Sequence, residues 1–341
     1  MRLVYAQMPR VSRRIAQSLA LAVGIALVAV SAGCGSSRLD GRVSIVGSTT
    51  LLPMMSEVAG SFGEQNPLVT MQVRMTGTGD GAGLFCDGLV WITAASRALN
   101  ERELAGCAAA GVEFTRLRVA DDAVVLFTPE DEALPTCLTS EQIYALMGPE
   151  SAAVDTWSAA SSIIPASGDD LPDVALNVVG PGSGAGTKQV LLDLIIGPIA
   201  KQRDQASMLR GNYDALTSEQ LIPSATRAAL GGLGFVGLPT FRQVSDGLRP
   251  LGIDAGGGCV TPTVEHVHDG TYPLGRPLFL YVNLQAVDSQ PALKAFVDSV
   301  LSDQGLAAAA ATGGISLDDP EQDEVRQHWQ EALTSGKGDA S

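Results

Sequence analysis

Histidine is scarce in this chain of 341 residues, which contains three, and no two cysteines stand in a Cys-x-x-Cys spacing. A Ser–His–acid triad therefore has few residues that can act as its base. The missing cysteine spacing argues against a structural zinc site. His266 and His268, flanked by Glu265 and Asp269, are interpreted as one solvated face of a strand. We expect no metal, no cofactor and no enzymatic activity.

Positive charge and long apolar runs are also in short supply. The chain has 22 Lys and Arg against 37 Asp and Glu, which gives a net charge of -15. Proteins that bind nucleic acids need a basic surface, so nucleic acid is excluded as a partner. The apolar run at residues 19–30 is too short to span a membrane comfortably.

The first 34 residues nevertheless carry a recognisable signal. Arginines, the apolar run and the small residues Ser31-Ala32-Gly33 follow one another, as in a secretory signal. Cys34 then resembles the lipobox cysteine of bacterial lipoproteins, which is lipidated and becomes the new N-terminus. We assign residues 1–33 as a lipoprotein signal peptide and 34–42 as a tether. The protein is then exported and anchored to the outer face of the cytoplasmic membrane, and the choice between Sec and twin-arginine export stays open.

Loss of the signal peptide changes the charge and the cysteine count. It removes four arginines and no acidic residue, so the net charge falls from -15 to -19. Four cysteines remain besides Cys34, and an even number in an exported protein permits two disulfides with three possible pairings. Cys86–Cys107 is favoured because these residues lie in neighbouring segments, which leaves Cys137–Cys259.

Apolar periodicity predicts alternating strands and helices, and hence an α/β sheet. Thr139 and Gln142 stand in capping-box positions at the start of one helix. In α/β sheets ligands bind beyond the carboxyl ends of the strands. Strands are expected at 43–46, 68–75, 89–93, 122–127, 175–179, 231–237 and 278–282, and helices include 51–62, 101–110, 139–147 and 292–306.

Three loops rich in glycine and threonine follow predicted strands, at residues 47–50, 76–79 and 180–188. Glycine lets the backbone approach a ligand closely, and hydroxyl groups add donors. The third loop opens a predicted helix, whose unpaired N–H groups favour an anion. It is not a Walker loop, because Thr187 precedes Lys188, and Pro181 excludes a nucleophile elbow around Ser183. Together the loops predict an oxyanion site.

The order of several blocks resembles the phosphate-binding proteins (PstS type) of bacterial phosphate ABC importers. The resemblance covers nearly all of residues 43–318. The blocks are Gly47-Ser48-Thr49-Thr50 with Pro53, Thr76-Gly77-Thr78-Gly79, Ala95-Ser96-Arg97-Ala98-Leu99, Leu138 to Ile143 followed by Gly148 and Trp157, Gly184-Ala185-Gly186-Thr187, and Tyr272-Pro273-Leu274-Gly275-Arg276-Pro277-Leu278.

This resemblance implies a two-lobed periplasmic-binding-protein fold of type II. The ligand cleft lies between lobes joined by a two-stranded hinge. Residues 43–119 plus 262–330 form the first lobe, 120–261 form the second, and 331–341 are a flexible tail. The residues that the resemblance implies for ligand binding are Thr49, Thr50, Thr78, Arg97, Ser183, Gly184, Ala185, Gly186 and Thr187.

The chain departs from the family at its third loop. Pro181 stands where the family usually has arginine, and Ala185 stands where it has serine. Ser183 is a candidate for the lost hydroxyl, and Lys188 or Arg97 for the lost charge. Asp80 is a candidate acceptor for the proton of monohydrogen phosphate; its alternative role is to favour the dipole of a helix in the first turn.

The resemblance implies a lipid-anchored, monomeric solute-binding protein that captures inorganic phosphate and delivers it to an ABC permease. Two alternatives remain open. The same fold binds another oxyanion, or binds phosphate only weakly, as the changes at Pro181 and Ala185 suggest. Otherwise the chain is a surface lipoprotein that has lost solute binding and contacts other proteins.

Overall fold

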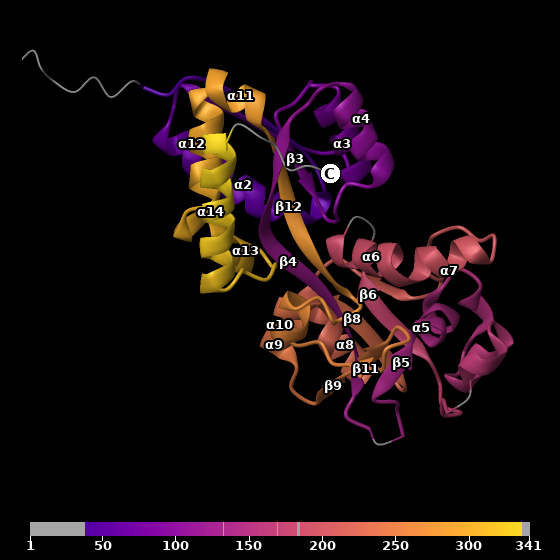
Figure 1. The fold of residues 1–341 in the computed structure, drawn as a ribbon. Coiled ribbons are helices and arrows are strands. Elements are labelled where there is room, and N and C mark those ends of the chain that lie inside the picture. Colours follow the sequence, from indigo (N-terminus) through magenta and orange to yellow (C-terminus); the bar gives the residue numbers. More distant parts are fainter. Residues whose placement is uncertain (1–37, 132, 169, 183–184, 336–341) are drawn as a thin grey trace, which may run out of the picture. The chain divides into compact units, whose positions relative to one another are not determined.

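A computed structural model describes residues 38–131, 133–168, 170–182 and 185–335. The predicted signal peptide, Cys34, Ser183 and Gly184 lie outside the described residues. The described residues from 39 to 335 form one compact unit of mixed strands and helices, as the sequence predicts (Figure 1). The first strand already begins at Gly41, so the predicted tether at 34–42 is two residues too long.

The unit is built around a sheet of nine strands in the order β2-β1-β3-β12-β4-β8-β6-β7, with β9 paired to β4. Strands β2, β1 and β3 are parallel, and β12 runs antiparallel to β3 and to β4. These strands are β1 (Gly41–Gly47), β2 (Val69–Met75), β3 (Ile92–Ala95), β4 (Phe114–Pro129), β6 (Asn177–Pro181), β7 (Asp214–Leu216), β8 (Gly232–Gly237), β9 (Leu248–Pro250) and β12 (Gly275–Asn283).

Two long strands, β4 and β12, connect two hydrophobic cores. Along β4 one core ends at Ala120 and the other begins at Ala123. On the β12 side the change of core falls between Leu274 and Leu278. Each core belongs to a separate lobe, and the paired strands form the two-stranded hinge between the lobes.

The first lobe contains both ends of the compact unit. Its helices are η1 (Thr49–Leu51), α2 (Leu52–Gln65), α3 (Thr78–Cys86), α4 (Glu101–Ala109), α11 (Leu284–Ser289), α12 (Pro291–Val300), α13 (Asp303–Ala311) and α14 (Asp319–Ser335). Helix α14 buries Val325, Trp329 and Ala332, which recur every three or four residues on one face. The predicted tail is therefore wrong for residues 331–335, which belong to this helix.

The second lobe packs its helices around β4, β6 and β8. They are α5 (Ser140–Met147), η2 (Ser151–Ala153), η3 (Ser158–Ser162), η4 (Pro165–Gly168), α6 (Gly186–Leu191), the π-helix η5 (Leu192–Ile196), α7 (Gly197–Gln202), η6 (Glu219–Leu221), α8 (Ile222–Ala228), α9 (Leu238–Val244) and α10 (Val264–His268). A small sheet joins β11 (Cys259–Val260), β10 (Gly252–Asp254) and β5 (Cys137–Thr139).

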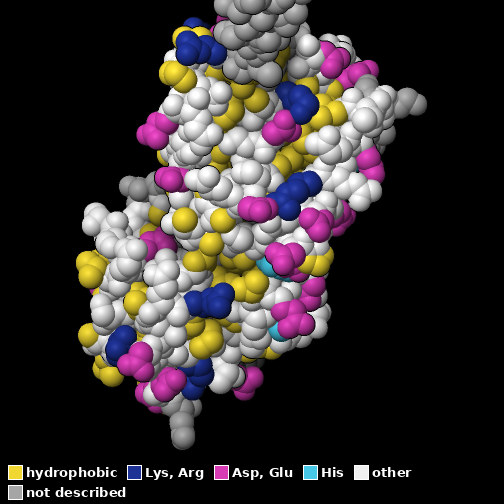
Figure 2. Space-filling view, turned by 90° about the vertical axis from the view of Figure 1, so that its left-hand side faces the viewer, with side chains coloured by type: hydrophobic (Ala, Val, Ile, Leu, Met, Phe, Trp, Pro, Cys, Tyr) yellow, Lys and Arg dark blue, Asp and Glu magenta, His cyan; other side chains and the backbone are white. Residues whose placement is uncertain are grey.

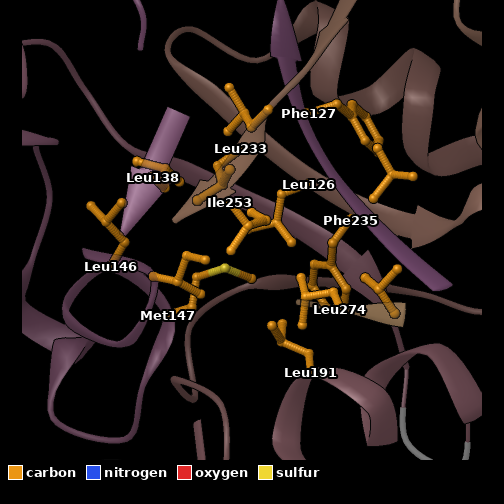
Figure 3. Packing of buried hydrophobic residues seen from close by; sticks show 14 of the residues in the cluster. Leu126, Phe127, Leu138, Leu146, Met147, Leu191, Leu233, Phe235, Ile253 and Leu274 are labelled. Carbon is orange, nitrogen blue, oxygen red and sulfur yellow. The ribbon is translucent and has the colours of Figure 1, made fainter. Parts of the chain in front are cut away.

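The boundary of the second lobe lies later in the chain than predicted. Leu274 points into the same core as Leu126 and Phe235 (Figure 3). Val267 and Tyr272 belong to this core as well. Residues 262–274 were expected in the first lobe, but their apolar side chains pack in the second.

Three local predictions also need correction. Strand β4 begins at Phe114 rather than at 122, because β12 pairs with its first half as well. The helix expected at 292–306 is two helices, since Ser302 caps the second through a bond from the Gly305 N–H. His266 and His268 lie on helix α10, not on a strand.

Both predicted disulfides, Cys86–Cys107 and Cys137–Cys259, are present. The predicted capping box at Thr139 is confirmed, with both reciprocal bonds to Gln142. Within residues 38–131, 133–168, 170–182 and 185–335, no helix combines the length and the apolar character that crossing a membrane requires.

Candidate functional site

A cleft of about 650 Å³ lies between the lobes. The hinge strands contribute Ala120, Asp122 and Leu278 to its wall. The first lobe contributes Thr49, Thr50, Leu51, Pro53, Met54, Ala309, Ala311, Thr312, Gly313 and Gly314, and the second contributes Gly186, Thr187, Thr217, Ser218, Glu219, Gln220, Gly237, Pro239, Thr240 and Gln243. Two of the three predicted loops thus reach this cleft.

The first loop joins β1 to helix α2 by a tight turn. Gly47 has a φ of +122°, and a Cβ at this position would lie 2.0 Å from the carbonyl oxygen of Ala94. Only glycine fits there. The Ser48 hydroxyl then accepts a hydrogen bond from the Thr50 N–H at 3.3 Å. This turn leaves Thr49 exposed in the cleft wall.

The second loop does not reach the cleft in this structure. The Thr78 hydroxyl accepts a hydrogen bond from the Ser96 N–H at 3.2 Å, which ties α3 to the end of β3. Asp80 is exposed in the first turn of α3 and lies in a separate pocket with Asn100 and Glu103. Neither Thr78 nor Asp80 is among the described residues that line the cleft. The position of Asp80 agrees with its alternative role at a helix N-terminus.

The glycine loop opens helix α6, as the sequence predicts. Ala185 is the N-cap residue in an extended conformation and provides no side-chain cap. Among the described residues, the N-cap side chain therefore gives no hydrogen bond to the first N–H groups of α6, and Thr187 is buried in the cleft wall in the first turn. A Cβ at Gly186 would lie 3.2 Å from the Thr50 hydroxyl oxygen, so loops from the two lobes touch here.

The two cations proposed to replace the family arginine are engaged elsewhere. Arg97 donates two hydrogen bonds of 2.8 Å to the Glu103 carboxylate. Lys188 donates to the Tyr213 hydroxyl at 3.2 Å and lies over its ring. Neither Arg97 nor Lys188 belongs to the described cleft wall.

A different arginine lies directly behind the wall. Arg276 on β12 stands opposite Asp122 on β4 in the hinge register. Its Nη2 donates to the Thr50 hydroxyl at 2.9 Å and lies 3.4 Å from Asp122, and its Nη1 lies 3.1 Å from Asp193. Burial raises the pKa of the Asp122 carboxyl, an effect that Arg276 opposes. From the sequence, Arg276 is interpreted as a structural ion pair, with direct contact to an anion as the less favoured alternative; its contact with Thr50 was not predicted.

A second charged cluster, unrelated to the cleft wall, surrounds Asp121. His268 and Glu321 bring possible metal ligands to within 4.8 Å of its carboxylate. Arg118, however, already donates to both Asp121 and Glu321, at 2.9 Å and 2.7 Å. This guanidinium supplies the positive charge that the carboxylates need, so we assign no metal here.

These features define a class of protein. Two α/β lobes are joined by two continuous strands, and polar loops from both lobes meet at the cleft between them. The molecule therefore has the architecture of a two-lobed binding protein, with a candidate ligand cleft between lobes that a hinge joins. The chain belongs to the PBP superfamily, because the family model described as "PBP superfamily domain" matches residues 32–304.

Individual relatives agree with this assignment. Protein SphX of Synechocystis sp. is 31% identical over 312 residues, which cover 90% of this chain and 86% of the relative. Phosphate-binding protein PstS of Staphylococcus aureus is 26% identical over 280 residues, covering 82% of this chain and 80% of the relative. The second relative is named as a binding protein, and together with the family match it confirms the prediction of a non-enzymatic protein.

A solved structure shows the same fold. It is described as a possible phosphate binding protein from Planctomyces limnophilus, is 26% identical, and matches with a TM-score of 0.78. The match covers 86% of this chain and 99% of that one. PstS from Borrelia burgdorferi, at 20% identity and a TM-score of 0.62, supports the fold alone.

Proposed function

We propose that this protein is a lipid-anchored, extracytoplasmic solute-binding protein that captures inorganic phosphate and delivers it to an ABC importer. Cys34 carries the lipid in this proposal, and the permease is the protein partner. The relatives named for phosphate support the ligand, and the signal sequence supports export and anchoring.

One observation carries the choice of ligand: two anion-binding loops, one from each lobe, meet at Thr50 and Gly186. Thr49 and Thr187 line the same cleft. The N–H groups at the start of α6, to which Ala185 gives no side-chain cap, add the positive end of a helix dipole. An oxyanion with several acceptor oxygens can satisfy donors from both lobes at once, which makes binding favour closure of the cleft.

The donors must act locally. The chain has a net charge of -15, and Figure 2 shows acidic side chains spread along one face, with basic side chains standing singly among them. Such a field repels anions at long range. Short charge-assisted hydrogen bonds inside the cleft are therefore the source of affinity.

Titration calorimetry on the chain from residue 35 onward, freed of bound ligand, tests the proposal. We expect saturable binding of phosphate and no response to sulfate. Thr187→Val removes a buried hydroxyl from the cleft wall and is expected to weaken phosphate binding about 10- to 100-fold, as for other hydrogen bonds to charged groups.

Thr70→Val is the matched control, because Thr70 is exposed on strand β2 away from the cleft. Its affinity for phosphate should equal that of the unchanged protein. Absence of heat with phosphate in correctly folded, ligand-free protein would refute the proposed function, as would binding of sulfate alone.

A further inference from the structure

The cleft wall lacks a cation of its own. Among the described residues that line it, none is lysine or arginine, whereas Asp122 and Glu219 are acidic. Pro181 of the third loop ends strand β6 and accepts a hydrogen bond from Tyr213 through its carbonyl. A multiply charged oxyanion in this cleft needs positive charge from another residue.

Arg276 is placed to supply this positive charge. Its side chain is 5% exposed, so its charge is poorly screened by solvent. Its guanidinium touches Thr50 and Asp122, both of which line the cleft. Its Nε is buried and has no hydrogen-bond partner. A buried charged donor without a partner is costly, and an anion beside it relieves that cost.

The contact with Thr50 has a direct consequence for the ligand. A hydroxyl oxygen that accepts a hydrogen bond from Nη2 at 2.9 Å has its own proton free to donate elsewhere. Thr50 lies in the wall, so that proton is available to an oxyanion in the cleft. A charged donor behind the hydroxyl also polarises its O–H bond and strengthens this second hydrogen bond.

Two carboxylates share the charge of Arg276: Asp122 lies 3.4 Å from Nη2 and Asp193 lies 3.1 Å from Nη1. Burial raises the pKa of the Asp122 carboxyl, and the neighbouring Arg276 opposes this rise. Asp193, on the π-helix η5, is 44% exposed, so solvent weakens its interaction with Arg276, and it also accepts a hydrogen bond from Gln189 at 2.6 Å.

We infer that Arg276 is a positioning residue of the ligand site: its hydrogen bond orients the Thr50 hydroxyl toward the bound oxyanion and places a positive charge directly behind the cleft wall. The inference rests on the proposed function. It places the charge on the hinge strand β12, beside Thr50 and Asp122 of the cleft wall.

The test compares phosphate affinities of Arg276→Gln, Arg276→Lys and the double variant Arg276→Gln/Asp122→Asn. The double variant removes both buried charges together, so Asp122 is not left unpaired if the single variant fails to fold. We expect glutamine variants to bind phosphate about 10- to 100-fold more weakly, and lysine to restore part of the loss. Arg203→Gln, which breaks another arginine–carboxylate pair outside the cleft wall, is the matched control and should bind normally.

A pH series separates a charge effect from a structural one. Phosphate gains a second negative charge near neutral pH. Loss of Arg276 should therefore weaken binding more above pH 7 than below it, whereas a merely distorted site loses affinity equally at all pH values. If the unchanged protein binds phosphate and the folded glutamine variants bind it equally well, the inference fails and the proposed function stands. If the unchanged protein binds none, the proposed function itself fails.

Discussion

Glu150 is the most heavily bonded carboxylate on the surface of the second lobe. Arg203 donates to it twice, at 2.7 Å and 2.9 Å, and the Tyr144 hydroxyl donates at 2.7 Å. The hydrogen bonds from Arg203 and Tyr144 lower the pKa of Glu150 to about 2. Unfolding returns this carboxyl to a pKa of about 4.3. The group therefore stabilises the fold above about pH 4.3, and its contribution disappears as the pH falls to about 2.

Glu150→Gln should lower the free energy of unfolding at pH 7 by about 1 kcal/mol, because solvent screens much of this pair. The difference from the unchanged protein should shrink as the pH falls below about 4.3. Urea unfolding measured across this range checks both points. Glu324→Gln, an exposed residue of helix α14, should cost little at any pH. A loss for Glu150→Gln that is the same at pH 7 and pH 3 would contradict the argument.

Single residues of the site were predictable where the signal is local. Thr49, Thr50 and Thr187 stand beside glycines in short loops, and the structure places all three in the cleft wall. Arg276 shows where prediction from local sequence signals fails. Its hinge partner Asp122 lies 154 residues away, and only the register of β12 on β4 brings the two together. Sequence reasoning therefore sought the missing charge near the loops, at Arg97 and Lys188.

For helices and strands as well, predictions that depend on neighbouring residues were correct, and predictions that depend on residues far apart in the sequence were not. The capping box of α5 needs only Thr139 and Gln142, and it forms as expected. Strand β4 needs β12 for its first half, which no local pattern reveals. The lobe boundary near 274 likewise depends on which core Tyr272 and Leu274 enter.

The disulfide Cys137–Cys259 ties two strands of the small sheet, β5 and β11, on either side of β10. It joins residues 122 apart, whereas Cys86–Cys107 joins residues 21 apart. A disulfide that closes a longer loop removes more conformational entropy from the unfolded chain. On this argument Cys137–Cys259 stabilises the fold by about 5 kcal/mol and Cys86–Cys107 by about 3 kcal/mol.

Replacing both Cys137 and Cys259 with serine should therefore destabilise the protein more than the same replacement at Cys86 and Cys107. Urea unfolding of the two double variants measures the difference directly. Equal losses, or a larger loss at Cys86 and Cys107, would show that native-state packing rather than chain entropy governs these bonds.

At the scale of the whole molecule, the hinge strands, the contacts across the cleft and Ile315, which follows α13 and packs in the core of the second lobe, link the two lobes. Arg276 lies on the hinge strand β12, and its guanidinium contacts both lobes, through Thr50 of the first and Asp193 of the second. Because Arg276 contacts both lobes beside the cleft, we expect the angle between the lobes to depend on the ligand in the cleft.

The close approach of Thr50 and Gly186 allows movement of the lobes to be tested. A Cβ at Gly186 would lie 3.7 Å from the Thr50 Cβ, within the 3.5–4.5 Å that a disulfide requires. The double variant Thr50→Cys/Gly186→Cys should therefore form a new disulfide on oxidation and fix the lobes in the observed arrangement. Ligand exchange requires the lobes to separate, so the oxidised variant should neither take up nor release phosphate on the time scale of the unchanged protein.

Loss of the Thr50 hydroxyl weakens binding by itself, so the informative comparison is between the oxidised and reduced forms of the same variant. Mild reduction should restore exchange, measured with radiolabelled phosphate, and small-angle scattering should then respond to phosphate again. Gly186→Cys alone, treated with the same reductant, controls for effects on the native disulfides. Unhindered exchange in the oxidised double variant would mean that phosphate enters without separation of Thr50 from Gly186, and the cleft would then be a preformed pocket rather than one closed by the lobes.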